Sequence, residues 1–190
     1  MADTDRISSQ LPAPLVSVVL PAWNAARTLG ATLQSLLGQR PAPGAPLPEF
    51  EIIVADDGST DDTLELLEYW ASPIRCGHRL RALHLPHGGI VAALNAGLAV
   101  ARGSFIARMD ADDTAHPLRI GTQAAHLFNN PQLSVSATCV AFGGDRATAH
   151  GFAHFVDWQN SLLTHNQISR ARFRDTPLCH PSVMFRRECV

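Results

Sequence analysis

The stretch Glu51-Ile52-Ile53-Val54-Ala55-Asp56-Asp57-Gly58-Ser59-Thr60 decides the fold class of this chain. Its first half is a short, β-branched apolar run, which is typical of a strand buried on both faces of a parallel sheet. Its second half is rich in Asp, Gly, Ser and Thr, which favour a turn and the start of a helix. The stretch therefore predicts a buried strand that ends in a polar turn ahead of a helix.

The same alternation of strand and helix repeats on both sides of this stretch. Gly103 and Pro117 mark the end of one predicted helix and the start of the next. Such alternation implies parallel strands joined by right-handed crossovers. We therefore predict an α/β fold with an open, mostly parallel twisted sheet and helices on both faces. The expected strands are 16–20, 51–55, 80–85 and 104–109, and the expected helices are 29–37, 60–71, 89–102 and 117–129.

The two ends of the chain are less regular. Residues 1–14 are polar and rich in proline near their end, so we expect a flexible leader ahead of a single domain over residues 15–190. In the last third, the sequence favours two further strands, an edge hairpin and a helix. These are a strand at 133–142, a hairpin at 147–156, a helix at 159–169 and a strand at 182–185.

Composition excludes several classes of protein. The chain has 190 residues, 46% of them hydrophobic, and a net charge of −2 without basic runs, which argues against a nucleic-acid partner. No apolar run approaches the roughly 18 residues of a membrane span, and the acidic start is no signal peptide. Four separated cysteines predict neither a disulfide framework nor a zinc knuckle. We expect a cytoplasmic protein, and peripheral contact of the full-length protein with the inner face of the membrane stays open.

Three predicted strands end in polar signatures, at residues 21–24, 56–61 and 110–113. Ligands of open α/β sheets bind beyond the carboxyl ends of the strands, so these signatures are expected along one edge. Asp110 and Asp112 are two apart in an expected extended segment, which would point both carboxylates to one side. Hard oxygen ligands of this kind suit Mg²⁺ or Mn²⁺. A turn that caps the helix at residue 117 is the alternative for one acidic cluster alone, but three converging signatures favour a metal.

The second signature also has two interpretations. One aspartate suffices for a turn and a helix cap, yet Asp56 and Asp57 are adjacent, and a carboxylate here could accept a hydrogen bond from a base N–H such as the imide of uracil. The glycines at 88–89 either let backbone approach a ligand or form an ordinary loop. Asn95, on the following helix, is more often a tolerated polar residue than a contact.

Four stretches together resemble the glycosyltransferase family 2 pattern of the GT-A fold: Val16–Asn24, Glu51–Thr63, Gly88–Gly103 and Ser104–Asp113. The resemblance continues more weakly through Cys179–Arg187. It implies a transferase that moves a sugar, with inversion, from a nucleotide-sugar donor to an acceptor hydroxyl, a UDP-sugar being favoured. It also implies a Mg²⁺ or Mn²⁺ cofactor held by Asp112 and helped by Asp110 or a water. The residues implied to bind the nucleotide are Pro21, Ala22, Trp23, Asn24, Asp56, Asp57, Gly88, Asn95 and Asp110.

The general base is the one part of the family pattern that the sequence does not supply. Members of this family carry it as an Asp or Glu downstream of the segment that resembles residues 180–187. Glu188 is too close to the last strand to match it, so no catalytic residue is assigned and the base is expected beyond Val190. We therefore expect a donor-binding portion with slow or absent transfer.

Three further expectations concern the acceptor side and assembly. His180 is the acceptor-side candidate, and Asp113 and Asp157 are the internal bases to test if transfer occurs. An uncovered last strand near Phe185 would expose apolar surface and favour a homodimer.

Two other functions remain as alternatives. A non-catalytic nucleotide-sugar binding module would lack the base naturally. A sugar nucleotidyltransferase ranks last, because that class usually has a Gly-rich, basic loop after its first strand, where this chain has Pro-Ala-Trp-Asn at residues 21–24. No G-x-G-x-x-G follows that strand either, which disfavours a dinucleotide enzyme. The arginines at 170, 172 and 174 are interpreted as a solvated surface, with phosphate or lipid head groups as the alternative.

Overall fold

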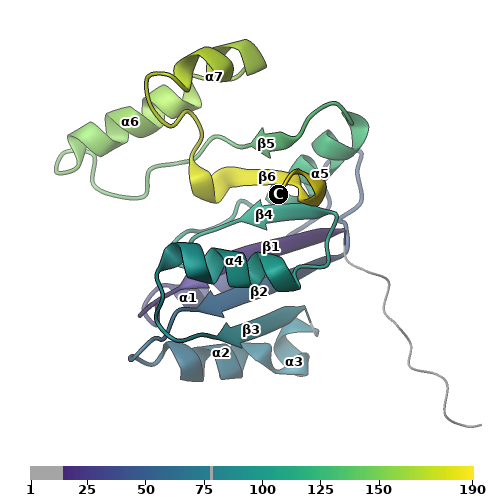
Figure 1. The fold of residues 1–190 in the computed structure, drawn as a ribbon, viewed down its shortest axis with the longest axis vertical. Coiled ribbons are helices and arrows are strands. Elements are labelled where there is room, and N and C mark those ends of the chain that lie inside the picture. The colour runs from purple at the N-terminus through teal and green to yellow at the C-terminus, as the bar shows by residue number, and fades with distance from the viewer. Residues whose placement is uncertain (1–14, 78) are drawn as a thin grey trace, which may run out of the picture.

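The computed structural model describes residues 15–77 and 79–190, so the expected leader at 1–14 lies outside the described residues. These residues form one six-stranded sheet in the order β3-β2-β1-β4-β6-β5 (Figure 1). β1 pairs in parallel with β2 and β4, β2 pairs in parallel with β3, and β6 pairs antiparallel with β4 and β5. The strands are β1 Val16–Ala22, β2 Phe50–Asp56, β3 Leu80–His84, β4 Phe105–Arg108, β5 Val135–Ala137 and β6 Val183–Arg186.

Helices lie on both faces of this sheet, which confirms the predicted α/β class. α4 packs on β1 and β2 on one face, and α1, α2 and α5 share the apolar core on the other (Figure 1). No helix of the described residues has the length and apolar character that a bilayer crossing requires. The helices are α1 Leu29–Leu37, α2 Thr63–Ala71, α3 Pro73–Cys76, α4 Ile90–Val100, α5 Arg119–Asn129, α6 His150–Asn160 and α7 His165–Ala171, with short 3₁₀ turns η1 His180–Ser182 and η2 Arg187–Cys189.

The neighbouring strands β1 and β2 are buried along their whole length, as their apolar sequences predict. Alternate residues of β1 and β2 face opposite layers: Leu20 belongs to the core under α1, whereas Val19 and Ile53 lie under α4. Gly97 permits the close approach of α4, because a Cβ there would lie 2.6 Å from Val19 Cγ1. The burial of these strands fixes the sheet, and with it the positions of the loops that follow each strand.

A buried polar network connects β1, β2 and the segment before β4 at the amino-terminal ends of these strands, the edge opposite the loops that follow them. Glu51 Oε1 accepts hydrogen bonds from Ser17 Oγ at 2.7 Å and from the Arg102 amide at 2.9 Å. Glu51 Oε2 accepts from Nε and Nη2 of the Arg102 guanidinium at 3.0 and 2.8 Å. Burial acts to raise the pKa of Glu51, but the donors of Arg102 and Ser17 outweigh it and hold the pKa below its ordinary value.

The variant Glu51→Gln is expected to destabilise the fold by about 2 kcal/mol at pH 7, because hydrogen bonds to a charged group are lost. A carboxyl whose pKa is lowered by folding stabilises above its unfolded pKa, and that stabilisation is lost as the pH falls through the folded-state pKa. The difference between variant and wild type should therefore shrink below about pH 4.5. Urea unfolding between pH 7 and 3.5 measures it, with the exposed Glu68→Gln as control. A difference that stays constant over this range would contradict the assignment.

The last third departs from the sequence prediction. The hairpin expected at 147–156 is wrong: α6 occupies this region, because Ala153, Val156 and Gln159 recur at helical spacing and are buried on one face. The helix expected at 159–169 is wrong in its extent, since α6 ends at 160 and α7 begins after a Thr164 cap. The strand expected at 133–142 is reduced to the three residues of β5.

The final strand, expected at 182–185, is confirmed as β6, displaced by one residue. β6 pairs antiparallel with both of its neighbours, so the sheet as a whole is mixed: parallel from β3 to β4 and antiparallel from β4 to β5. Phe185 is half-buried against the cluster formed by Val19, Ile53, Ala101 and Ile106. The strand is thus only partly uncovered.

Candidate functional site

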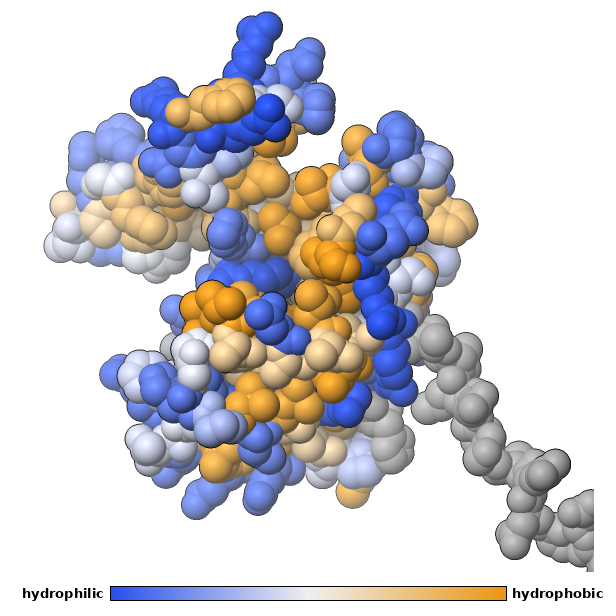
Figure 2. Space-filling model, viewed as in Figure 1, coloured by the Kyte–Doolittle hydropathy of each residue, from blue (hydrophilic) through white to orange (hydrophobic). Residues whose placement is uncertain are grey.

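The strand order reverses between β1 and β4, which lie side by side in the sheet. β1, β2 and β4 run in the same direction, so the loops after residues 22, 56 and 108 emerge at one edge (Figure 1). The surface is hollowed beside this edge, between α6 and the sheet (Figure 2). The prediction that three polar signatures share one edge is confirmed, and the edge is the place where open α/β sheets bind ligands.

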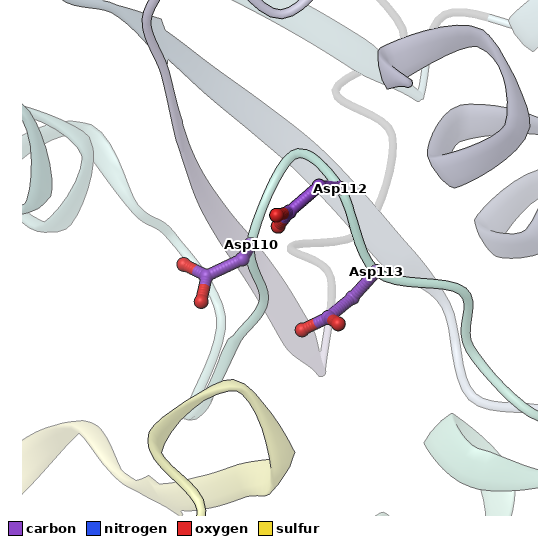
Figure 3. Close-up of side chains that lie close together, drawn as sticks. All are labelled: Asp110, Asp112 and Asp113. Carbon is purple, nitrogen blue, oxygen red and sulfur yellow. The ribbon is translucent and has the colours of Figure 1, made fainter. Parts of the chain in front are cut away.

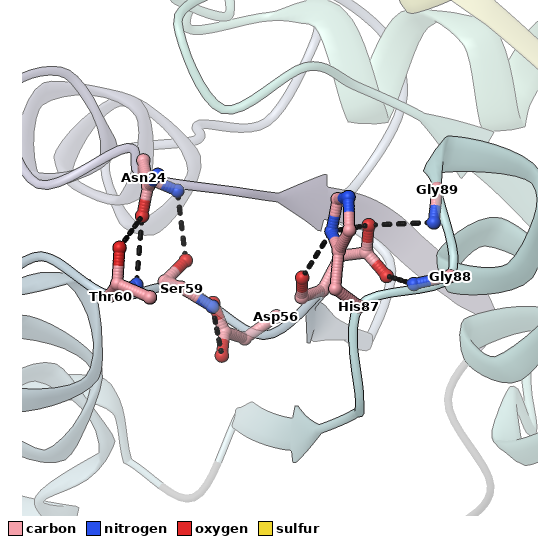
Figure 4. A network of polar contacts seen from close by, with 8 residues as sticks. Asn24, Asp56, Ser59, Thr60, His87, Gly88 and Gly89 are labelled. Carbon is pink, nitrogen blue, oxygen red and sulfur yellow. Dashed lines mark hydrogen bonds and ion pairs between the residues drawn. The ribbon is translucent and has the colours of Figure 1, made fainter.

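The first two loops are bound to each other. The Asn24 amide donates to Ser59 Oγ at 2.8 Å, and Asn24 Oδ1 accepts from the Thr60 amide at 2.8 Å (Figure 4). Asn24 has a φ of 48°, a left-handed conformation that Asn adopts more readily than most residues. Asp61 adds a second link, because its carboxylate accepts from the Ala26 amide and from Thr63. The side chain of Asn24 therefore shapes the rim of the site.

Asp57 directly follows β2 and holds the loop between β3 and α4. Its Oδ1 accepts from the Gly88 amide at 2.8 Å, and its Oδ2 accepts from the Gly89 amide at 2.9 Å (Figure 4). His87 Nδ1 lies 3.0 Å from Oδ2. The Gly88 amide above all, then the Gly89 amide and His87, hold the pKa of Asp57 below its ordinary range. Asp57 is an ionised carboxylate, and because the Gly89 amide and His87 Nδ1 both lie on Oδ2, it is Oδ1 that has a second lone pair for a further donor.

An aromatic pair stands next to this carboxylate. Trp23 stacks on His87 with ring centroids 4.9 Å apart and an interplanar angle of 28°. The Trp23 side chain is largely exposed, whereas Pro21 and Ala22 are buried within β1. Of the four residues at 21–24, Trp23 thus offers the flat apolar surface, and the two before it position that surface.

Asp56 differs from its neighbour Asp57. Its side chain is buried, and Oδ2 accepts a long hydrogen bond of 3.4 Å from the Ser59 amide. Its Oδ1 has no hydrogen-bond donor among the described residues. A buried acceptor without a donor costs stability, so the contact of Asp56 with the Ser59 amide is made at an energetic cost.

The third loop carries an acidic cluster that consists of Asp110, Asp112 and Asp113 (Figure 3). One carboxylate oxygen from each lies within 4.8 Å of the others. The extended segment predicted for 110–112 is wrong, since residues 111 and 112 form a turn, and it is the turn that brings the carboxylates together. Thr32 Oγ1 fixes this turn because its one O–H proton is shared between the carbonyl oxygens of Ala111 at 2.9 Å and Asp113 at 2.8 Å.

The sequence suggests Asp113 only as an internal base to test. It does not predict that Asp113 belongs to the acidic cluster. Burial, together with the charges of Asp110 and Asp112, raises the pKa of Asp113. The signal that could have found it is the turn composition of Asp110–Asp113 itself, because a turn folds the chain back on itself and an extended strand does not. Three carboxylates with converging oxygens are a donor set that fits Mg²⁺ or Mn²⁺.

Two arginines flank the cluster. Arg108, the last residue of β4, contacts Asp110 with two guanidinium nitrogens: Nη2 lies 2.6 Å from Oδ1 and Nη1 lies 2.7 Å from Oδ2. Arg119 is buried at the start of α5 and donates from Nη2 to the Arg108 carbonyl at 2.8 Å. Burial lowers the pKa of Arg119 to about 10, so it stays protonated at neutral pH.

Within the described part of the chain, the remaining predicted residues take no part in the hydrogen bonds and ion pairs of the site described above. Asn95 is exposed on α4, and among the described residues it has no hydrogen bond to the loops of the site. His180 begins η1, which contacts β4, and its side chain is exposed. The preceding thiol of Cys179 has its pKa raised by burial and by the charge of Asp113, which places this segment beside the acidic cluster. Asp157 lies on α6 and forms an ion pair with Arg146, which precedes that helix.

The last four residues, 187–190, lie away from the acidic cluster. The Arg187 amide donates to the Ser104 carbonyl at 2.9 Å, so η2 lies at the amino-terminal end of β4, whereas the cluster follows its carboxyl end. Glu188 and Val190 are both exposed there. This placement agrees with the exclusion of Glu188 as the general base. That the base lies beyond Val190 stays a prediction.

Comparisons with known proteins agree with this geometry. The family model described as glycosyl transferase family 2 matches residues 17–190. An uncharacterized glycosyltransferase of Haemophilus influenzae is 32% identical over 91% of this chain and 52% of its own length. The chain spans between 10% and 56% of the length of the curated relatives that it matches.

Solved structures share the fold. Residues 1–349 of S. aureus TarS in complex with UDP match 68% of this chain and 37% of that chain, with a TM-score of 0.58 and 28% identity. The mannosyltransferase PcManGT of Pyrobaculum calidifontis, in complex with GDP-Man and Mn²⁺, matches 93% of this chain and 45% of that chain, with a TM-score of 0.65 and 22% identity. The family match over almost all described residues, together with the GT-A arrangement of the sheet, shows that the chain belongs to glycosyltransferase family 2.

Proposed function

We propose that the carboxyl edge of β1, β2 and β4 binds the nucleoside diphosphate of a nucleotide-sugar whose sugar is transferred, with inversion, to an acceptor hydroxyl. One observation carries the proposal: an ionised, hydrogen-bonded Asp57 and a cluster of three carboxylates stand on neighbouring strand ends at the point where the strand order reverses. The first suits the base and the second suits the metal that accompanies a diphosphate. The UDP complex of TarS supports UDP as the nucleotide.

The base would lie beside Asp57 and Trp23. Oδ1 of Asp57 has a second lone pair that can accept the imide N–H of uracil, and Trp23 with His87 supplies a stacked aromatic surface. Gly88 contributes indirectly, because its amide orients the Asp57 carboxylate. Asn24 and Asp56 hold the surrounding loops, and Asn95 is the predicted contact that the fold supports least.

The acidic cluster fits a Mg²⁺ or Mn²⁺ ion, with Asp112 as its most exposed carboxylate. A divalent ion held there supplies charge neutralisation to the diphosphate leaving group. The chain's own part is to hold the carboxylates in place through Thr32 and the β1–β4 pairing. His180 is the acceptor-side candidate, since η1 packs against β4 next to the cluster.

Isothermal titration calorimetry with UDP tests the proposal. We expect UDP to bind at least about tenfold more tightly with Mn²⁺ than in EDTA, because a bridging cation contributes more than one kcal/mol. The variant Asp57→Ala should weaken the binding of uridine as well as of UDP, whereas Glu68→Gln, an exposed change on α2, should alter neither. Equal affinity in Mn²⁺ and EDTA would remove the metal from the proposal, and no UDP binding at all would overturn the proposal itself.

A further inference from the structure

We propose that Arg108 is a positioning residue that keeps Asp110 away from the divalent ion, so that Asp112 and Asp113 are the protein ligands and the nucleotide-free protein binds the ion weakly. This inference rests on the proposed metal at the acidic cluster. It differs from the sequence expectation, in which Asp110 helps Asp112 to hold the ion.

The contact between Arg108 and Asp110 uses both carboxylate oxygens. Two parallel N–H···O contacts of 2.6 and 2.7 Å form the bidentate pair that a planar guanidinium makes best, and such charge-assisted bonds are stronger than neutral ones. The Arg108 side chain is 13% exposed and that of Asp110 is 31% exposed, so water screens the pair only partly. An ion that took Asp110 as a ligand would have to break this pair. Asp112 and Asp113, in contrast, have no ion pair among the described residues.

The position of Arg108 is set by the fold. β4 lies in register with β1, where Arg108 pairs with Val19, and the Arg108 carbonyl accepts from Arg119 Nη2. Arg119 is itself buried and donates from Nε to Gln123 Oε1 at 3.1 Å. Because these contacts anchor the backbone at residue 108, the guanidinium is presented to Asp110 before any ligand arrives.

The charges around the cluster have a second consequence. Three carboxylates face two guanidinium groups, of Arg108 and Arg119, and the cation is therefore attracted by a small net negative charge. A nucleoside diphosphate adds negative charge to the same place. The arrangement favours binding of the ion together with the nucleotide over binding of the ion alone.

The test measures Mn²⁺ binding to the nucleotide-free protein, through the loss of the electron paramagnetic resonance signal of free Mn²⁺. Arg108→Gln frees Asp110 and removes a positive charge within a few ångströms, so we expect binding to tighten about tenfold. Arg108→Lys keeps the positive charge but cannot form the bidentate pair, so its Mn²⁺ affinity should lie between those of wild type and Arg108→Gln. Asp112→Asn should weaken binding at least about tenfold. Arg170→Gln, which removes an exposed arginine on α7, is the matched control and should change nothing.

The double variant Arg108→Gln, Asp110→Asn separates charge from ligation. It removes the pair as a neutral unit, so the net charge of the cluster is unchanged and Mn²⁺ affinity should return to within about threefold of wild type. A double variant at least tenfold weaker than wild type would show that Asp110 is a ligand and overturn the proposal. The proposal is also overturned if Arg108→Gln binds Mn²⁺ no more tightly than wild type does. This includes the case in which neither protein binds the ion at up to millimolar Mn²⁺.

These outcomes are independent of nucleotide binding. If the calorimetric titration with UDP fails while the Mn²⁺ series behaves as expected, the proposed function is wrong and the role of Arg108 stands. If UDP binds in a Mn²⁺-dependent manner and the double variant loses Mn²⁺ binding, the proposed function stands and the role of Arg108 is wrong. Thermal melts of each variant check the fold, and the double variant, which leaves no unpaired charge, supplies the decisive value if Arg108→Gln alone is unstable.

Discussion

The variant Asp112→Asn is expected to lose the Mn²⁺-dependent part of UDP binding almost completely, so that its affinity in Mn²⁺ falls by the whole wild-type factor between Mn²⁺ and EDTA, about tenfold or more. Asp112 is the exposed member of the acidic cluster and has no ion pair among the described residues, so its carboxylate is the one most free to bind a cation. Asparagine has nearly the same shape but no charge, so the fold should be retained. Affinity for UDP in EDTA, and for uridine, should stay within about twofold of wild type.

Calorimetry with UDP in Mn²⁺ and in EDTA gives all of these values from one set of proteins. Asp145→Asn is the control, because this exposed aspartate lies in the loop before α6 and its Oδ1, which accepts from the Ala147 amide, is preserved in the amide side chain. If Asp112→Asn still binds UDP more tightly in Mn²⁺ than in EDTA by the wild-type factor, the cation is bound elsewhere. The acidic cluster is then a structural turn and not a metal site.

The variant Gly103→Ala is expected to cost about 3 kcal/mol of stability, or to prevent folding, because no space exists for its methyl group. A Cβ at this position would lie 2.5 Å from the Ser17 amide nitrogen and 2.7 Å from the Val16 carbonyl carbon, both in the backbone of the central strand β1. Neither atom can move without displacing the sheet. A loss of this size lowers the melting temperature of a chain of about this length by about 6–12 °C.

Differential scanning calorimetry measures the shift, and Gly143→Ala is the matched control. A Cβ at Gly143 would meet no atom within 4 Å, and the residue has an ordinary φ, so the melting temperature should change by less than about 2 °C. A Gly103→Ala protein that melts as the control does would mean that β1 and the segment before β4 are less tightly packed than the structure has them.

The first two-thirds of the fold could be predicted from the sequence because each buried strand is an apolar run that ends at polar residues. β1 and β2 show this pattern directly, and the burial of all their residues leaves few alternatives. Strand direction then follows from the helices between strands, which forces the carboxyl ends of β1, β2 and β4 to one edge. The location of the candidate site is thus a consequence of patterning.

The last third could not be predicted in the same way because local preference and tertiary packing disagree there. Aromatic residues and a glycine in 150–160 suggest a strand, yet Ala153 and Val156 are buried on one side of a helix. β5 has three residues and receives its partner from β6, at the far end of the chain, so nothing local marks it. Long-range pairing of this kind has no signature within a short window of sequence.

Within the site, side-chain roles were the least predictable feature. Arg108 and Asp110 are two residues apart at the end of a strand, a spacing that puts both on one side, so their pairing could have been anticipated. The inclusion of Asp113 depends on a turn that Thr32 of α1 stabilises from 81 positions away in the chain. Such a contact is set by the packing of α1 and becomes evident only in three dimensions.

The pairing of β4 with β6 also affects the order in which the protein can be completed on the ribosome. β4 ends at residue 108, and its outer neighbour begins at residue 183. At about 5–20 residues per second, the intervening chain takes roughly 4 to 15 seconds to synthesise. During this interval β4 is an edge strand with unpaired amide and carbonyl groups, a state in which strands readily join the wrong neighbour. The acidic turn therefore acquires its final support late, and nascent chains that stall before residue 183 are the ones expected to need protection by chaperones.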